Sequence, residues 1–143
     1  MINFSNVTKV YPHNHTALEE ISFKIEEKEF VSLVGKSGAG KTTLFKLLLV
    51  EEKPTQGRIF FEGKDLAKIK GKDLPQTRRR MGTVFQDYKL LPLKNTYENV
   101  AYILEVIGKS DKEIEKEVPE VLDIVGLADK AKIFPHELSA GEC

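Results

Sequence analysis

At 143 residues the chain has the length of one domain, and its 41% of hydrophobic residues suffices for a packed core. Its 22 basic and 22 acidic residues balance, which argues against a nucleic-acid partner, and no apolar run approaches the ~18 residues that cross a bilayer. The N-terminus lacks the features of a secretory signal, and the single cysteine, Cys143, excludes an internal disulfide. We therefore expect a globular cytosolic domain.

The first 34 residues alternate short apolar runs with polar turns. Ile2–Val7 is a strand candidate, Ile21–Ile25 shows a strict period of two, and Phe30–Val34 is a short β-rich run. This pattern predicts a small β-rich portion whose last strand leads into the next segment.

That next segment, from Gly35 to Thr42, matches the phosphate-binding pattern G-x-x-x-x-G-K-[ST]. It is followed by an apolar run over residues 44–49 that predicts a helix. Glycines allow backbone N–H groups to surround phosphate oxygens, Lys41 adds a positive charge, and the Thr42 hydroxyl can coordinate Mg²⁺. The pattern predicts a nucleotide site formed by Gly35, Lys36, Ser37, Gly38, Ala39, Gly40, Lys41, Thr42 and Thr43.

Turn residues at 54–57 and 62–65 enclose the strand candidate Arg58–Phe61, which predicts a hairpin-like excursion. A helix is expected to begin near Asp73 and to end at Arg78-Arg79-Arg80, the only dense basic cluster. Met81–Gln86 is again strand-like and ends in a polar loop.

From Asn95 the apolar period changes to about 3.6, which indicates helices. Asn95 and Glu98 resemble a capping pair, with Gly108 as a stop, and Ser110 and Glu113 form a second capping box with a stripe that continues to Gly126. Pro119 lies inside that stripe, so we expect this helix to be kinked or split.

Three motifs in this order resemble those of ATP-binding cassette (ABC) ATPases. They are the phosphate loop, the stretch Val84-Phe85-Gln86-Asp87 and the stretch Leu138-Ser139-Ala140-Gly141-Glu142. The branch of cell-division ATP-binding proteins within that family is the most similar one, on the residues Ser37–Leu44, Arg78–Gly82, Val84–Pro92 and Tyr97–Ala101. The resemblance implies an α/β P-loop NTPase fold: residues 1–94 as the antiparallel β subdomain with the first part of the core, and residues 95–143 as the helical subdomain up to the signature.

The resemblance also implies roles for individual residues. Tyr11 corresponds to the aromatic residue that stacks on adenine, and Gln86 to the glutamine that positions Mg²⁺ or the attacking water. Ser139, Ala140, Gly141 and Glu142 correspond to the LSGGQ signature, which completes the ATP site of a second subunit in trans. Ala140 departs from the usual glycine. ATP and Mg²⁺ are the implied ligands, and a homodimer with shared ATP sites is the implied assembly.

Members of this family carry an Asp-Glu strand, a D-loop and a switch histidine soon after the signature, and none can be assigned in residues 1–143. We therefore expect the chain to be an N-terminal fragment, cut before the Walker B strand, and its own hydrolytic activity to be doubtful.

The leading hypothesis is an ATP-binding subunit at the inner face of the plasma membrane, which couples ATP binding and hydrolysis to an integral membrane partner of FtsX type in cell division. Alternatives are the ATP-binding subunit of a solute, lipoprotein or peptide transporter with a permease partner, or a nucleotide-binding fragment without hydrolysis. A P-loop kinase or a DNA-repair ATPase fits the signature and the charge balance less well.

Overall fold

The computed structural model describes all 143 residues and divides the chain into two compact units, residues 1–82 and residues 83–143. We describe each unit by itself. No helix in either unit has both the length and the apolar character needed to cross a membrane.

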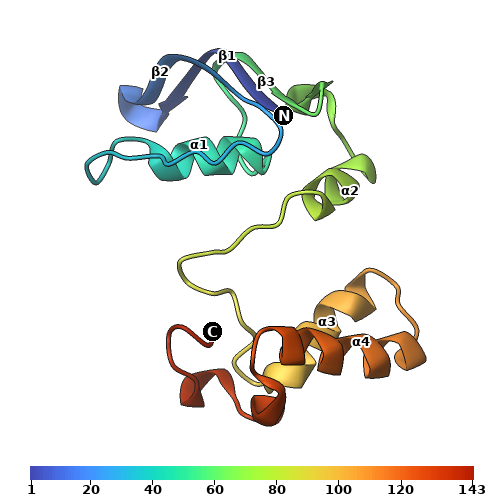
Figure 1. Ribbon diagram of the computed structural model, residues 1–143. Helices are drawn as coiled ribbons and strands as arrows, with labels where there is room; N and C mark the ends of the chain where they lie inside the picture. Colours follow the sequence, from blue (N-terminus) through green and yellow to red (C-terminus); the bar gives the residue numbers. More distant parts are fainter. The chain divides into compact units, whose positions relative to one another are not determined.

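The first unit is built on a four-stranded antiparallel sheet with the order β2-β1-β3-β4 (Figure 1). The strands are β1 (Ile2–Tyr11), β2 (His15–Ile25), β3 (Gln56–Phe61) and the two-residue β4 (Lys64–Asp65). The three strands expected over 2–7, 21–25 and 58–61 are therefore confirmed, as is the hairpin, whose turn residues Glu62 and Gly63 both have positive φ.

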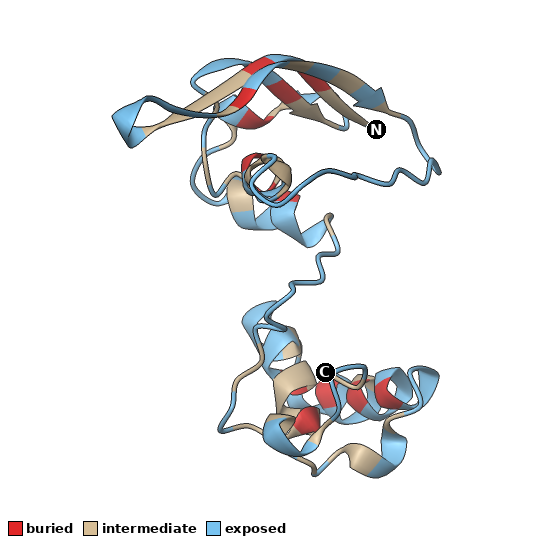
Figure 2. Cartoon of the chain, turned by 90° about the vertical axis from the view of Figure 1, so that its left-hand side faces the viewer, coloured by how far each residue is buried: buried red, intermediate tan, exposed pale blue.

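Helix α1 (Lys41–Leu48) lies against one face of this sheet (Figures 1 and 2). Phe4, Val7 and Ile59 from the strands and Leu47 from the helix are almost completely buried in one cluster. The rings of Phe4 and Phe23 stack at a centroid distance of 4.6 Å. Burial of this apolar cluster is the main stabilising contribution in the first unit.

The expected helix near Asp73 is α2 (Asp73–Arg79). The Arg78 Nε donates a hydrogen bond of 2.8 Å to the Leu49 carbonyl oxygen at the end of α1, and Arg80 forms an ion pair with Glu62. Two of the three clustered arginines therefore have partners within the first unit.

Two strand predictions are wrong. Neither Phe30–Val34 nor Met81–Gln86 belongs to the sheet, and neither run has strand structure. A strand is stabilised by hydrogen bonds to a neighbouring strand, whereas the apolar pattern reports only on the segment itself. Phe30 and Val84 are 94% and 97% exposed, so the packing that would favour an extended strand at these positions is missing as well.

The second unit contains helices α3 (Thr96–Val106) and α4 (Asp111–Ile124), which pack through a small core. The buried residues of this core are Ala101, Ile114, Val118 and Leu122. Both helices begin where the capping residues predicted: the Asn95 Oδ1 accepts from the Glu98 backbone N–H at 2.9 Å, and the Glu98 carboxylate accepts from the Asn95 N–H at 2.8 Å.

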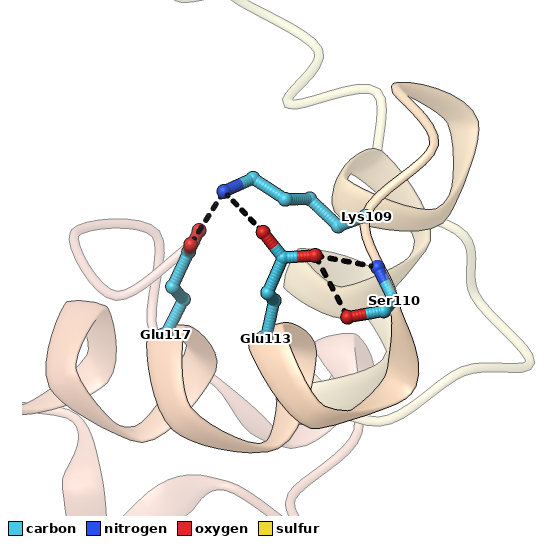
Figure 3. Close-up of polar contacts among 4 residues, drawn as sticks. All are labelled: Lys109, Ser110, Glu113 and Glu117. Carbon is cyan, nitrogen blue, oxygen red and sulfur yellow. Dashed lines mark hydrogen bonds and ion pairs between the residues drawn. The ribbon is translucent and has the colours of Figure 1, made fainter.

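At the start of α4 the Glu113 carboxylate accepts hydrogen bonds from both the backbone N–H and the hydroxyl of Ser110, and Lys109 reaches Glu113 and Glu117 (Figure 3). The bonds from Ser110 and then Lys109 lower the pKa of Glu113 to about 2. A carboxylate held at a helix N-terminus also interacts favourably with the helix dipole, so this cluster fixes the first turn of α4.

Pro119 was expected to kink or split α4, and the split does not occur, because the helix is continuous from Asp111 to Ile124. Proline removes the hydrogen bond to the carbonyl of residue 115. Pro119 and Glu115 lie on the exposed face, where water can satisfy that carbonyl, while Val118 and Leu122 keep the opposite face packed.

Candidate functional site

The phosphate-loop sequence forms a closed turn at the N-terminus of α1. The Lys41 ammonium donates hydrogen bonds to the carbonyl oxygens of Gly35, at 2.7 Å, and Lys36, at 2.8 Å. The Ala39 N–H donates to the Lys36 carbonyl oxygen at 3.2 Å. Lys41 thus ties the start of the loop to the start of the helix, and its positive charge lies at the loop.

Glycine is required at the last loop position. Gly40 is the N-cap of α1, with a φ of +84°, and a Cβ built there would lie 2.4 Å from the Ala17 carbonyl oxygen and 2.7 Å from Leu18 Cδ2. Gly38 has a similar φ of +81°, but a Cβ there would meet nothing within 4 Å. The glycine at 40 allows the loop to approach β2, and the one at 38 serves the backbone conformation alone.

The loop residues fit a nucleotide phosphate chain with Mg²⁺. Residues 35–39 and Thr42 are exposed, so backbone N–H groups, the Lys41 charge and the Thr42 hydroxyl can be reached by a ligand. The N-terminus of α1 supplies the positive end of a helix dipole at the same place. Lysine and backbone N–H groups suit phosphate oxygens, and a hydroxyl oxygen suits Mg²⁺.

Tyr11 ends β1, and the Lys9 ammonium lies 4.8 Å from the centroid of its ring. Lys9 also donates to Glu52 at 2.8 Å, and this hydrogen bond lowers the pKa of Glu52. The Lys9 ammonium therefore contacts the Tyr11 ring and is itself held in place by the Glu52 carboxylate. Adenine stacking by Tyr11 stays a prediction.

Gln86 lies in an exposed turn that precedes α3. The chain after this turn is organised by Asn99, a residue to which the sequence reasoning assigned no role. Its Oδ1 accepts from the Leu91 N–H at 2.7 Å, and its Nδ2 donates to the carbonyl oxygens of Lys94 and Asn95 at 2.8 and 3.0 Å. The sequence signal that could have indicated this role of Asn99 is an asparagine one turn after a helix start, in a stretch similar to the family.

The segment with the signature residues is attached to the start of α3. The Thr96 N–H and hydroxyl both donate to the Ile133 carbonyl oxygen at 2.8 Å, and the Tyr97 N–H donates to the Ala131 carbonyl oxygen at 2.8 Å. These bonds satisfy N–H groups that the first turn of a helix otherwise leaves unpaired. They also fix the chain shortly before Leu138.

Residues 139–143 form one helical turn. The N–H groups of Glu142 and Cys143 both donate to the Ser139 carbonyl oxygen, at 3.0 and 3.1 Å. The Glu142 carboxylate accepts from the Ser139 N–H and from its hydroxyl, each at 2.8 Å, and forms an ion pair with Lys130. These contacts, led by that from Lys130, lower the pKa of Glu142 to about 2. Ser139 thus begins a hydrogen-bonded turn, and the helix start expected for the signature stays a prediction.

The predicted site residues are distributed over both units. The first unit holds Tyr11 and the complete loop 35–43, and within it the structure brings Gly35, Lys36 and Lys41 into contact. The second unit holds Gln86 and the signature residues 139–142, and there it brings Ser139 and Glu142 into contact.

Comparisons with known proteins agree with these motifs. The family model described as ABC transporter matches residues 18–143. The chain is 53% identical over 142 residues to the cell division ATP-binding protein FtsE of Bacillus subtilis, and 44% identical to that of Escherichia coli. In both cases the match covers 99% of this chain, which spans 62% of the Bacillus protein and 64% of the Escherichia protein.

Solved structures show the same similarity in three dimensions. The ATP-binding cassette MJ0796, solved as a dimer in a post-hydrolysis state with ADP and Pi, superimposes with a TM-score of 0.85 at 33% identity. A dimeric structure of MJ0796, described as a bacterial ABC transporter cassette, superimposes with a TM-score of 0.86. Each match covers 99% of this chain and 65% of the other, and together they confirm the expected ABC-type nucleotide-binding fold. Family model, sequence relatives and structures agree, and the chain belongs to the ABC transporter family.

Proposed function

We propose that the chain is the nucleotide-binding part of an FtsE-like ATP-binding subunit, which binds ATP with Mg²⁺ and couples its hydrolysis to an integral membrane partner of FtsX type in cell division. The observation that carries this proposal is the loop 35–40 closed by Lys41 at the N-terminus of α1. The identity of 44–53% to FtsE proteins supports the cell-division assignment.

In this proposal the residues at 35–43 hold the phosphates, Thr42 and Gln86 hold Mg²⁺, and Tyr11 stacks on adenine. When bound, MgATP supplies the phosphoryl group whose hydrolysis drives the partner. Ser139, Ala140, Gly141 and Glu142 contact the nucleotide bound by a second copy, so the acting unit is a homodimer. The functional division is a β subdomain with part of the core, 1–94, and a helical subdomain, 95–143. The protein acts in the cytoplasm, at the inner face of the plasma membrane.

The direct test is nucleotide binding by the Lys41→Ala variant. Loss of the charge and of the two bonds to Gly35 and Lys36 should weaken binding of a fluorescent ATP analogue with Mg²⁺ by about tenfold or more. Lys46→Ala, which removes an exposed lysine from the last turn of the same helix, is the matched control and should bind like the wild type. Equal binding by wild type and Lys41→Ala would overturn the loop assignment.

A second candidate is the ATP-binding subunit of a solute, lipoprotein or peptide transporter, since a structure with a TM-score of 0.86 is described as a transporter cassette. The two candidates differ in the membrane protein that they bind. Co-purification of the natural protein with its membrane partner distinguishes them: an FtsX-type partner supports the first, and a transporter permease supports the second.

A further inference from the structure

In the turn of residues 139–143, which we call the signature turn, the Glu142 carboxylate accepts the hydrogen bond that the Ser139 hydroxyl can donate. Ser139 donates its hydroxyl proton to the Glu142 Oε2 at 2.8 Å, and its backbone N–H donates to the same oxygen at 2.8 Å. A serine hydroxyl has one proton to donate, whereas phosphate oxygens accept hydrogen bonds and donate none. As arranged here, the Ser139 hydroxyl has no proton to offer to a phosphate.

Glu142 also carries a charge of the same sign as a phosphate. A carboxylate next to an incoming anion costs electrostatic free energy unless a cation compensates it. In this structure the compensating cation is Lys130, at the end of the short 3-10 helix Ala128–Lys130, whose ammonium pairs with the other carboxylate oxygen, Oε1. The side chains of Lys130 and Glu142 are only 34% and 28% exposed, so solvent screens this pair incompletely.

We propose that Lys130 is the positioning residue that makes the signature turn able to accept a phosphate. It holds the Glu142 carboxylate, compensates its charge and lets the Ser139 hydroxyl turn from Glu142 to the ligand. Lys130 acts through Glu142 and does not itself contact the nucleotide. This inference rests on the proposed function, because the ligand is the terminal phosphate of the ATP held by a second copy.

The experiment measures dimer formation of the natural full-length protein by sedimentation velocity, over a range of concentrations of a non-hydrolysable ATP analogue with Mg²⁺. The Lys130→Met variant should need about three- to tenfold more analogue for half-maximal dimer, the range expected for an incompletely screened charge pair. Lys130→Arg keeps the charge and should remain within about twofold of the wild type.

The decisive variant is the double substitution Lys130→Met with Glu142→Gln. Without the carboxylate there is no charge to compensate, so the analogue concentration for half-maximal dimer should differ by less than about twofold between the double variant and the Glu142→Gln single variant. In a Ser139→Ala background, Lys130→Met should have a smaller further effect, because only the uncompensated charge of Glu142 then acts on the phosphate. A lysine whose role does not depend on Glu142 would behave differently, since its loss would have the same effect with and without the Glu142 carboxylate.

Monomer binding of the fluorescent analogue separates the two proposals. Lys130→Met should leave it unchanged, because the phosphate loop lies on the other subunit of each shared site. Absence of nucleotide binding or of nucleotide-dependent dimers in the wild type would contradict the proposed function. Normal dimerisation of Lys130→Met, or a Lys130→Met defect of equal size in the Glu142→Gln background, would overturn the role of Lys130 alone. If Lys130→Met does not fold, Lys130→Gln replaces it, with folding checked by circular dichroism.

Discussion

Two glycines of the phosphate loop share a backbone conformation and differ in their surroundings. Gly38→Ala places a side chain at φ +81° in open space, which should lower the free energy of unfolding by about 1 kcal/mol. Gly40→Ala adds a clash with the Ala17 carbonyl oxygen at the same kind of φ and should cost about 2–4 kcal/mol in total. Urea unfolding of the two variants measures the difference, and equal costs would show that the loop does not approach β2 as described.

The Glu113 carboxylate predicts an acid dependence for the second unit. Its pKa is about 2 in the folded state against an ordinary 4.5, so the folded state binds the proton more weakly than the unfolded state. The stability that Glu113 contributes is fully present above pH 4.5 and is lost as the pH falls towards 2. Glu113→Gln should therefore lower the melting temperature of residues 83–143 at neutral pH and make little difference near pH 2. A difference in melting temperature between the wild type and Glu113→Gln that does not change with pH would contradict this linkage.

At the scale of the element, Asn99 links α3 to the chain that precedes it. Asn99→Ala removes one acceptor and one donor group that serve Leu91, Lys94 and Asn95, and should destabilise the second unit by about 2 kcal/mol. The Leu91 amide should also lose its protection from hydrogen exchange, because its acceptor is gone. Glu105→Ala, on the exposed part of the same helix, should change stability by less than about 0.5 kcal/mol. Retained protection at Leu91 would argue against the Asn99 contact.

The elements also show where local sequence signals suffice. Asn95 with Glu98 and Ser110 with Glu113 located the starts of α3 and α4, because a capping box is made by residues three positions apart in the same segment. The split considered at Pro119 does not occur, although propensity penalises proline within a helix regardless of exposure. The packing of Val118 and Leu122 against α3 outweighed that penalty.

At the scale of the whole molecule, the exposed apolar segments set the solution behaviour of the 143-residue polypeptide. Phe30 and Val34 are 94% and 85% exposed, and Val84 is 97% exposed. We expect this polypeptide to bind a hydrophobic dye and to aggregate with increasing concentration, and Phe30→Ser combined with Val34→Ser to reduce both. Dye fluorescence and light scattering measure the effect. A sharp, reversible melt that does not depend on concentration would contradict this expectation.

The sequence by itself indicated the phosphate loop, the capped starts of α3 and α4 and parts of the strands β1 to β3, because each carries a pattern within its own segment; that β1 pairs with both β2 and β3 was decided by the tertiary structure. The roles of Tyr11, Gln86 and the signature residues came from the family resemblance and stay predictions. Only the tertiary structure decided that Phe30–Val34 and Met81–Gln86 are not strands, and that Lys130 pairs with Glu142. The physical reason is the same in both cases. A helix forms its hydrogen bonds internally, whereas a strand and an ion pair between distant residues need a partner that local periodicity does not reveal.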